Sequence, residues 1–193
     1  MDVSWNRIKN IISKAKDLRH LALANILGKA IAGVFWFYIA ATLGAENYGQ
    51  VTYFIAIGTM AASFALVGTT NTLIVYVAKK VPIQPAIYFI TLILGTIASI
   101  IVVLVYDSYE AGLFVIGYVI FNLAISDLLG RKSYKRYSKF FILQKVLFVV
   151  CALGLYYVLD FPGIILGFAI SFLVFTPIII SGFREHPLNF SVL

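Results

Sequence analysis

Hydrophobic and polar positions follow one another along this chain in long blocks. Six apolar runs are separated by short polar segments, and they cover residues 20–43, 49–78, 84–106, 111–130, 139–159 and 161–183. A helix needs about 20 mostly apolar residues to cross a bilayer. Membrane-barrel strands would alternate polar and apolar residues, which these runs do not. The pattern therefore predicts an all-α polytopic membrane protein, with six transmembrane helices packed as one bundle or lobe over residues 20–183.

The two ends of the chain differ from this lobe. Residues 1–19 carry six apolar side chains within one arc of a helical wheel: Trp5, Ile8, Ile11, Ile12, Ala15 and Leu18. Four cations lie outside that arc: Arg7, Lys9, Lys14 and Lys16. This is the pattern of a basic amphipathic helix lying in the headgroup region. The alternative is a frayed tail whose cations only set the topology. Residues 184–193 are expected to form a short cytoplasmic tail.

Composition agrees with a membrane protein. Of 193 residues, 62% are hydrophobic and 12% charged, against about 45–50% and about 25% in an ordinary soluble domain. These values exclude a cytosolic enzyme, a nucleic-acid-binding domain and a secreted module. Cys151 is the single cysteine, and the two histidines lie near opposite ends of the chain. Neither a metal site nor a cofactor is expected from them.

Charge is distributed asymmetrically between alternate loops. Lysine and arginine occur in the N-terminal segment, at 79–80, at 131–139 and at Arg184, whereas the other loops hold carboxylates and no cation: Glu46, Asp107, Glu110 and Asp160. The positive-inside rule then places both termini in the cytoplasm of a multi-pass protein of the cell membrane. The net charge of +7 is a topology signal on this interpretation, and no nucleic-acid partner is expected.

Polar residues within the apolar runs are candidates for function, because a charge at bilayer depth is costly. Lys29 lies roughly 13 Å into the first run at 1.5 Å per residue, and Asn25 is one turn earlier on the same face. Lys29 either faces a polar cavity or snorkels toward the cytoplasm. For Lys145, in the fifth run, the structural and functional interpretations are equally open.

Other features of the runs favour structural roles. Asp127 is expected to form an ion pair with Arg131 or Lys132 at the end of the fourth run. The pair Gly163 and Gly167 is typical of helix packing in membranes, and Pro177 predicts a kink. The segment 68–72, which includes Asn71, interrupts the second run and either lines water or bonds across helices.

No arrangement of catalytic residues is apparent in the sequence. There is no paired carboxylate site, no Ser–His–Asp arrangement and no glycine loop of the kind that holds phosphates. The longest loop is short and basic. The chain is therefore not expected to be an enzyme.

Three segments resemble one family of membrane proteins. Residues 35–50 read FWFYIAATLGAENYGQ, where an apolar helix closes on Leu-Gly and an acidic Tyr-Gly turn follows. Residues 66–80 form a glycine-centred end to a second helix, and residues 137–167 form a basic loop, a long apolar run and a Gly-Ile-Ile-Leu-Gly segment. In order and spacing these segments resemble the N-terminal six-helix half of the lipid-linked oligosaccharide or polysaccharide flippases (Wzx type), within the superfamily of drug/cation antiporters and lipid II flippases (MOP/MATE).

That resemblance implies membrane transport during polysaccharide biosynthesis, by two lobes that rock around a central cavity. A cationic cavity in such proteins accepts the pyrophosphate of an undecaprenyl- or dolichyl-linked sugar while the lipid tail stays in the bilayer. On this basis Lys29, Asn25, Asn71 and Lys145 are the substrate-cavity candidates. Family members have twelve to fourteen spans, so a homodimer or a second six-helix half is expected to complete the transporter.

Two other interpretations remain, one from a different class and one from the same superfamily. The chain could be a non-transporting scaffold or subunit, or a fragment without activity of its own, whose basic loops contact anionic lipid. An ion-coupled multidrug antiporter would require an acidic residue deep in the membrane, and the midplane of these runs holds none.

Overall fold

The computed structural model describes the backbone of residues 2–185 and the side chains of Arg19 and residues 21–185. Throughout that part the chain is helical, without a strand, which confirms the expected all-α class. The elements are α1 (Asp2–Ala65), α2 (Thr69–Ala78), α3 (Gln84–Tyr106), α4 (Tyr109–Gly130), α5 (Tyr134–Leu159), α6 (Phe161–Phe172), the 3₁₀ turn η1 (Leu173–Phe175) and α7 (Thr176–Glu185).

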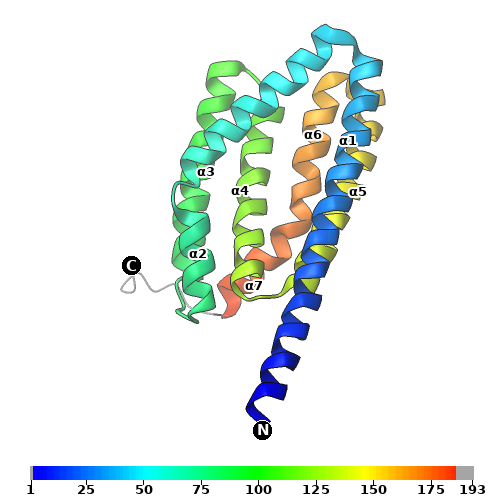
Figure 1. Ribbon diagram of the computed structural model, residues 1–193. Coiled ribbons are helices and arrows are strands. Elements are labelled where there is room, and N and C mark those ends of the chain that lie inside the picture. The colour runs from blue at the N-terminus through cyan, green and yellow to red at the C-terminus, as the bar shows by residue number, and fades with distance from the viewer. Residues whose placement is uncertain (1, 186–193) are drawn as a thin grey trace.

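Helix α1 changes direction sharply at one residue. Gly44 has φ 72° and ψ 171°, a conformation that is essentially restricted to glycine. The helix rises to the upper end of the molecule, turns there, and descends obliquely toward α2 (Figure 1). The expectation of a connecting loop over residues 44–48 is wrong, since residues 45–48 are helical. A single glycine makes the whole turn, so no loop is needed.

Five helical stretches among the described residues are long and apolar enough to cross a membrane: Leu21–Ala65, Gln84–Tyr106, Tyr109–Gly130, Tyr134–Leu159 and Phe161–Glu185. The protein is therefore a multi-pass membrane protein. The first stretch has 45 residues, which at 1.5 Å per residue is about 67 Å and exceeds twice the hydrocarbon core of a bilayer. Gly44 divides this stretch near its middle.

The other helix breaks fall where the sequence indicates them, with one shift. Gly68, in a left-handed conformation, separates α1 from α2, and the other residues of the polar segment 68–72 are helical. The turn η1 precedes Pro177, so the expected kink also exists. The basic stretch expected at 131–139 is shorter than predicted, because α5 begins at Tyr134. Polar residues of that stretch occupy the first turns of a helix that extends beyond its apolar part.

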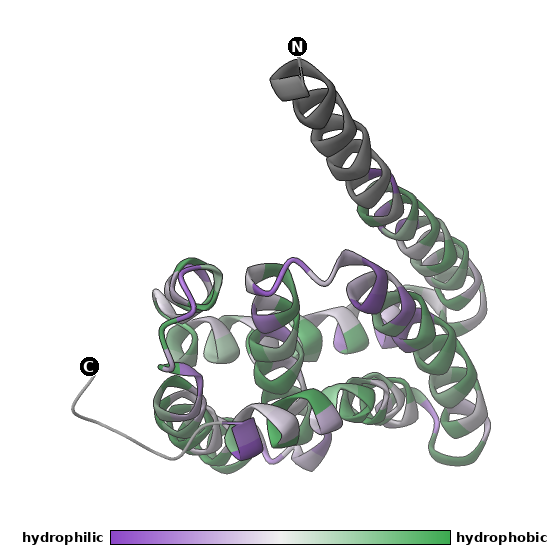
Figure 2. Cartoon of the chain, turned by 90° about the horizontal axis from the view of Figure 1, so that it is seen from below, coloured by the Kyte–Doolittle hydropathy of each residue, from purple (hydrophilic) through white to green (hydrophobic). Residues whose placement is uncertain are grey.

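Packing explains the pairing of α5 with α6. A Cβ at Gly163 would lie 2.2 Å from the Leu155 carbonyl oxygen, and one at Gly167 would lie 2.4 Å from the Ala152 nitrogen. The two glycines therefore let the backbones approach directly, which confirms their predicted role in packing. Large apolar side chains point outward instead, as Phe37 does at 82% exposure. Figure 2 shows hydrophobic helices joined by hydrophilic loops.

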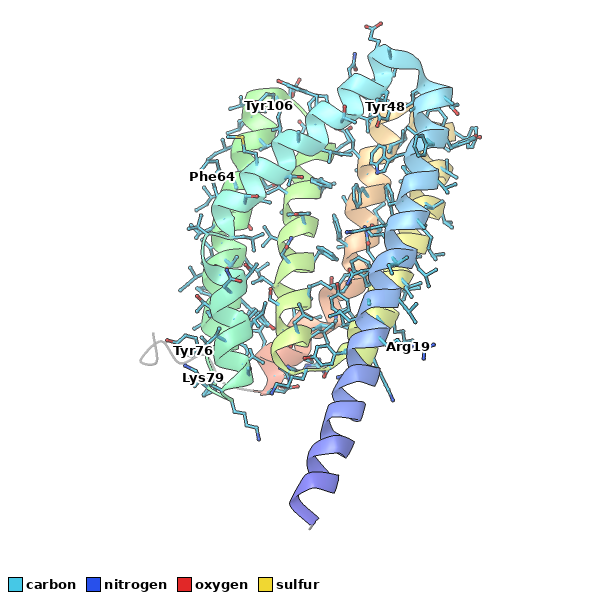
Figure 3. The ribbon with its side chains drawn as sticks, viewed as in Figure 1. Arg19, Tyr48, Phe64, Tyr76, Lys79 and Tyr106 are labelled. Atoms are coloured by element: carbon cyan, nitrogen blue, oxygen red, sulfur yellow. The ribbon has the colours of Figure 1, made fainter. Side chains whose placement is uncertain are left out.

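The two ends of the bundle carry different labelled side chains, with cations at one end and tyrosines at both. Arg19, Tyr76 and Lys79 lie at the lower end, and Tyr48 and Tyr106 at the upper end (Figure 3). The loops that follow α2 and α4 also lie at the lower end (Figure 1). The helix expected at residues 1–19 is helical from Asp2 and continuous with the rest of α1. Its side chains before Arg19 are outside the described residues, so its apolar face stays a prediction.

Candidate functional site

The ascending part of α1 and helix α5 run side by side through most of the bundle (Figure 1). Asn25 of α1 contacts Tyr137 of α5, and higher in the bundle Phe35 contacts Phe148. Residue numbers rise in the same direction along both helices, so the two helices are parallel. Phe35 is buried against Phe148 with ring centroids 4.5 Å apart, and Phe148 in turn contacts Phe168 of α6 at 4.2 Å. This aromatic stack fixes α1 on the pair formed by α5 and α6.

Below the stack, a polar contact and a glycine join the same helices. The Tyr137 hydroxyl donates to Asn25 Oδ1 at 3.3 Å, while Asn25 Nδ2 donates to the Leu21 carbonyl at 2.9 Å. A Cβ at Gly28 would lie 2.5 Å from the Phe141 ring and 3.3 Å from Cγ of Lys145. Asn25 therefore positions the two helices, and Gly28 leaves room for the Lys145 side chain.

Lys145 is half-buried and its ammonium group lies among aromatic rings. Nζ is 5.4 Å from the centroid of Phe141 and 5.8 Å from that of Phe168. Ring faces attract a cation by roughly 0.5–2 kcal/mol, which compensates only part of the cost of removing it from water. Among the described residues, the ion pairs within 4.0 Å all involve Arg131. Lys145 thus has aromatic partners and no carboxylate partner in that part of the chain.

Lys29 lies at the level of Lys145. It follows Gly28, which contacts Lys145, and its own side chain is exposed on the surface of α1. The structure therefore places Lys29 and Lys145 at one level on paired helices, with Asn25 one helical turn below Lys29. Lys29 lies about 100° around α1 from Gly28, the residue that faces α5, so its side chain does not point toward Lys145.

Above the two lysines, an apolar groove of about 500 Å³ runs between α1 and α5. It is lined by residues on one side of each helix: Ala30, Ile31, Val34, Phe35, Tyr38, Val149 and Leu153. Near its upper end the Tyr38 and Tyr157 hydroxyls lie 3.1 Å apart. The volume is within the range of about 300–1,000 Å³ that is typical of ligand pockets. The groove matches the apolar tail of an amphiphile, and Lys145 lies one helical turn below Val149 of its lining.

Asn71 does not belong to this arrangement. Its side chain is exposed on α2, which packs on α4 and α3 at the opposite side of the bundle from α5 (Figure 1). The neighbouring Thr72 hydroxyl donates to the Gly68 carbonyl at 2.9 Å. The segment 68–72 therefore forms the start of α2, and Asn71 stays an untested candidate apart from the groove.

A second polar cluster lies at the lower end, and here charges are paired. Arg131 Nε donates to Asp127 Oδ2 at 2.7 Å, which confirms the expected ion pair, and Arg131 Nη1 donates to Glu185 of α7. Burial of the guanidinium works against its charge, but hydrogen bonds to Glu185 and Asp127 raise the Arg131 pKa above its ordinary value. Asp127 is 1% exposed. The cluster ties α7 to α4.

Sequence reasoning missed two residues that make polar contacts between helices. Gln144 is fully buried and donates to the Ser171 hydroxyl at 2.9 Å, which joins α5 to α6. Glu185 was assigned only to a tail. For Gln144 a signal existed, since a lone amide in an apolar run needs a partner. For Glu185 the partner lies 54 residues away in sequence, so no local pattern could reveal it.

Comparison with known proteins identifies no relative: no protein-family model, curated protein or solved structure matches this chain.

Proposed function

We propose that this protein is one six-span lobe of a membrane transporter that flips a lipid-linked anionic saccharide across the bilayer. In this proposal the two parts of α1 on either side of Gly44 cross the membrane separately, the second continuing into α2. With α3, α4, α5 and the α6–α7 segment, they make six spans. The basic lower end then faces the cytoplasm, with both termini, by the positive-inside rule.

The observation that carries this proposal is the apolar groove between α1 and α5, with Lys145 one helical turn below Val149 of its lining. A polyprenyl tail fits a groove whose lining is apolar from Ala30 to Leu153. A pyrophosphate next to that tail would lie near the Lys145 ammonium group. Two opposite charges 4 Å apart attract by about 4 kcal/mol near a protein surface, compared with about 1 kcal/mol in water.

The partial burial of Lys145 lowers the cost of binding an anionic head group. An ammonium group that already lies against the rings of Phe141 and Phe168 has lost part of its hydration before the substrate arrives. Binding therefore costs less desolvation at that position. Lys29, on the exposed surface of α1, can follow the head group as the lobe moves.

A second lobe would complete the pathway for the sugar. The exposed face of α1 carries Lys29 near the large apolar side chain of Ile26, three residues earlier, which is 64% exposed. A second copy of this chain, or a different six-helix half, packed near this face would enclose the lysines between the lobes. Alternating access then follows from rocking of the two lobes about the enclosed site.

The direct test is flipping in liposomes. The full chain would be reconstituted with a fluorescent undecaprenyl-pyrophosphate-linked disaccharide, and a membrane-impermeant quencher would report how much probe reaches the other leaflet. We expect the wild-type protein to move the probe, and Lys29→Gln and Lys145→Gln each to slow the movement at least about tenfold, since about 1.4 kcal/mol of lost binding has that effect.

Lys139→Gln is the matched control. Lys139 is an exposed lysine on α5, so its removal changes the net charge equally but leaves the groove intact, and flipping should persist. No movement of the probe by any variant, together with a strictly monomeric particle in nanodiscs, would contradict the proposal and favour the scaffold or fragment. Unchanged flipping by both groove variants would exclude the groove as the binding site.

A further inference from the structure

A second cavity, distinct from the groove, lies at the basic lower end of the bundle. Its volume is about 500 Å³, and its polar lining comes from the ends of α2, α3, α4 and α7: Lys80, Gln84, Arg131, Lys132 and Glu185. This volume again fits a small ligand or the head group of a larger one. The flipping site does not use any of these residues.

Two lysines of this cavity hold equivalent positions at neighbouring helix ends. Lys80 follows the end of α2 and has φ 59°, and Lys132 follows the end of α4 and has φ 56°. Each lies one residue beyond the helix cap, where a left-handed conformation is usually supplied by glycine. The backbone N–H groups close the turns in the same way, from Lys80 to the Val77 carbonyl and from Lys132 to the Leu129 carbonyl, both at 3.0 Å.

Close packing brings these two helix ends together. A Cβ at Gly130 would lie 2.7 Å from Cβ of Val77, so α4 approaches α2 directly at the cavity wall. Both lysine side chains are exposed, and neither forms an ion pair among the described residues. Two unpaired cations therefore lie at the edge of one cavity.

Deeper in the cavity, polar groups remain without partners. Arg131 Nη2 is buried and unbonded, although the other nitrogens of this guanidinium bind Asp127 and Glu185. Gln84 is only 5% exposed, and its Oε1 is also unbonded. Buried donors and acceptors normally find a partner. An anion with hydroxyl groups would supply an acceptor to Arg131 and a donor to the Gln84 amide.

The balance of charged side chains around the cavity indicates how many negative charges that anion carries. Three cations, Lys80, Arg131 and Lys132, are opposed by two carboxylates, Asp127 and Glu185. A ligand with one negative charge restores neutrality. The position at the ends of the apolar helices is where lipid head groups lie, and basic pockets between transmembrane helices bind anionic head groups.

We propose that this cavity binds the head group of an anionic phospholipid with one phosphate and a hydroxyl-bearing group, as in phosphatidylglycerol. The phosphate contacts Lys80, Lys132 and Arg131, and a head-group hydroxyl contacts Gln84. The acyl chains extend along the apolar outer surface. This site is separate from the groove, and it does not depend on whether the protein flips a saccharide.

Native mass spectrometry of the full chain in detergent tests the site. The protein would be titrated with phosphatidylglycerol or with phosphatidylcholine of the same acyl chains. We expect several-fold tighter binding of phosphatidylglycerol. The double variant Lys80→Gln/Lys132→Gln should weaken that binding about 30-fold, because each surface lysine contributes about fivefold.

The double variant Lys135→Gln/Lys139→Gln is the matched control. Both lysines are exposed on α5 and outside the cavity lining, so phosphatidylglycerol binding should persist. Equal binding of the two lipids, or equal loss in both double variants, would overturn the proposal. Displacement of the lipid by millimolar inorganic phosphate would assign the cavity to a soluble anion instead.

Thermal stability separates ligand binding from helix capping. If the two lysines only interact with the partial negative charge of the helix ends, their loss should lower the melting temperature equally in both lipids. The proposal expects phosphatidylglycerol to raise the melting temperature of the wild-type chain and of the Lys135→Gln/Lys139→Gln control, but not that of the cavity variant. Equal stabilisation of the cavity variant would overturn it.

Discussion

Helix α5 has two neighbours that it contacts in very different ways. Toward α6, Gly163 and Gly167 bring the helix backbones into direct contact. Toward α1, the contacts run through side chains, as between Phe35 and Phe148, and an apolar groove of about 500 Å³ lies beside them. One interface, the closed one, joins backbone to backbone, and the other joins side chain to side chain and leaves a groove. Both are built on the same helix, so the difference comes from the residues that face each neighbour.

This difference separates residues that stabilise the lobe from residues available to a ligand. The closed interface also buries its polar groups in pairs, as Gln144 with Ser171. Lys145, by contrast, has the rings of Phe141 and Phe168 as its partners among the described residues. A charge that the fold does not compensate reduces stability, so its presence there favours a functional role. Substitutions on the two sides of α5 should therefore have different effects.

The largest effect is expected at the closed interface. Gly167→Ala places a methyl group against the Ala152 backbone, and such overpacking should lower the free energy of unfolding by about 3 kcal/mol. Unfolding by denaturing detergent measures this. Gly154→Ala is the control, because nothing lies within 4 Å of its Cβ position, and it should stabilise the helix by about 0.5–1 kcal/mol. Equal effects of the two substitutions would contradict the contrast between the interfaces.

Lys145→Met should change stability and binding in opposite directions. Removing a half-buried cation without a carboxylate partner should raise the free energy of unfolding by about 1–2 kcal/mol. The same change should weaken binding of undecaprenyl pyrophosphate at least about tenfold. Denaturation and a fluorescence binding titration measure the two quantities, with Lys139→Met unchanged in both. If Lys145→Met is instead less stable, Lys145 is a structural residue.

A smaller effect is expected from filling the groove. Val34 lines the groove and is 72% exposed, so Val34→Trp adds bulk there without disturbing the buried core. Binding of the same lipid should weaken about fivefold, which corresponds to roughly 1 kcal/mol. The free energy of unfolding should stay within about 0.5 kcal/mol of wild type, as for other surface substitutions. Unweakened binding would show that the tail lies elsewhere.

The smallest effect is expected at the upper end of the groove. Tyr157→Phe removes the hydroxyl that lies 3.1 Å from the Tyr38 hydroxyl. Since Tyr157 is 73% exposed, the free energy of unfolding should fall by only about 0.5 kcal/mol. Denaturation of the two proteins side by side measures this. A loss above about 2 kcal/mol would mean that this contact, rather than the aromatic stack at Phe35, holds α1 on α5.

Much of the helical organisation could be predicted from the chain. The boundaries expected for the third apolar run, 84–106, coincide with α3 (Gln84–Tyr106). The breaks at Gly68 and before Pro177, and the packing role of Gly167, were also predictable, because glycine and proline have local conformational consequences. The position of the turn at Gly44 was predictable, but its form was not. That a single residue makes the turn is visible only in the tertiary structure.

The candidate site was only partly predictable. Lys29, Asn25 and Lys145 were identified because polar residues in apolar runs are costly. Their proximity depends on α1 packing parallel to α5, at a separation of more than 100 residues along the chain. Asn71 was selected by the same argument and lies elsewhere. The free-energy cost of a polar residue in the membrane marks it as a candidate, but it does not indicate which helix the residue faces.

The sequence by itself determines that this is an all-α multi-pass membrane protein with its cations gathered at one end. Length, hydropathy and the placement of Gly and Pro act locally, so they can be evaluated along the chain. The tertiary structure alone decides which charges are compensated. Arg131 donates hydrogen bonds to Glu185 and Asp127, whereas the Lys145 ammonium group lies against the rings of Phe141 and Phe168. Pairing depends on which helices become neighbours, and that results from packing the whole bundle.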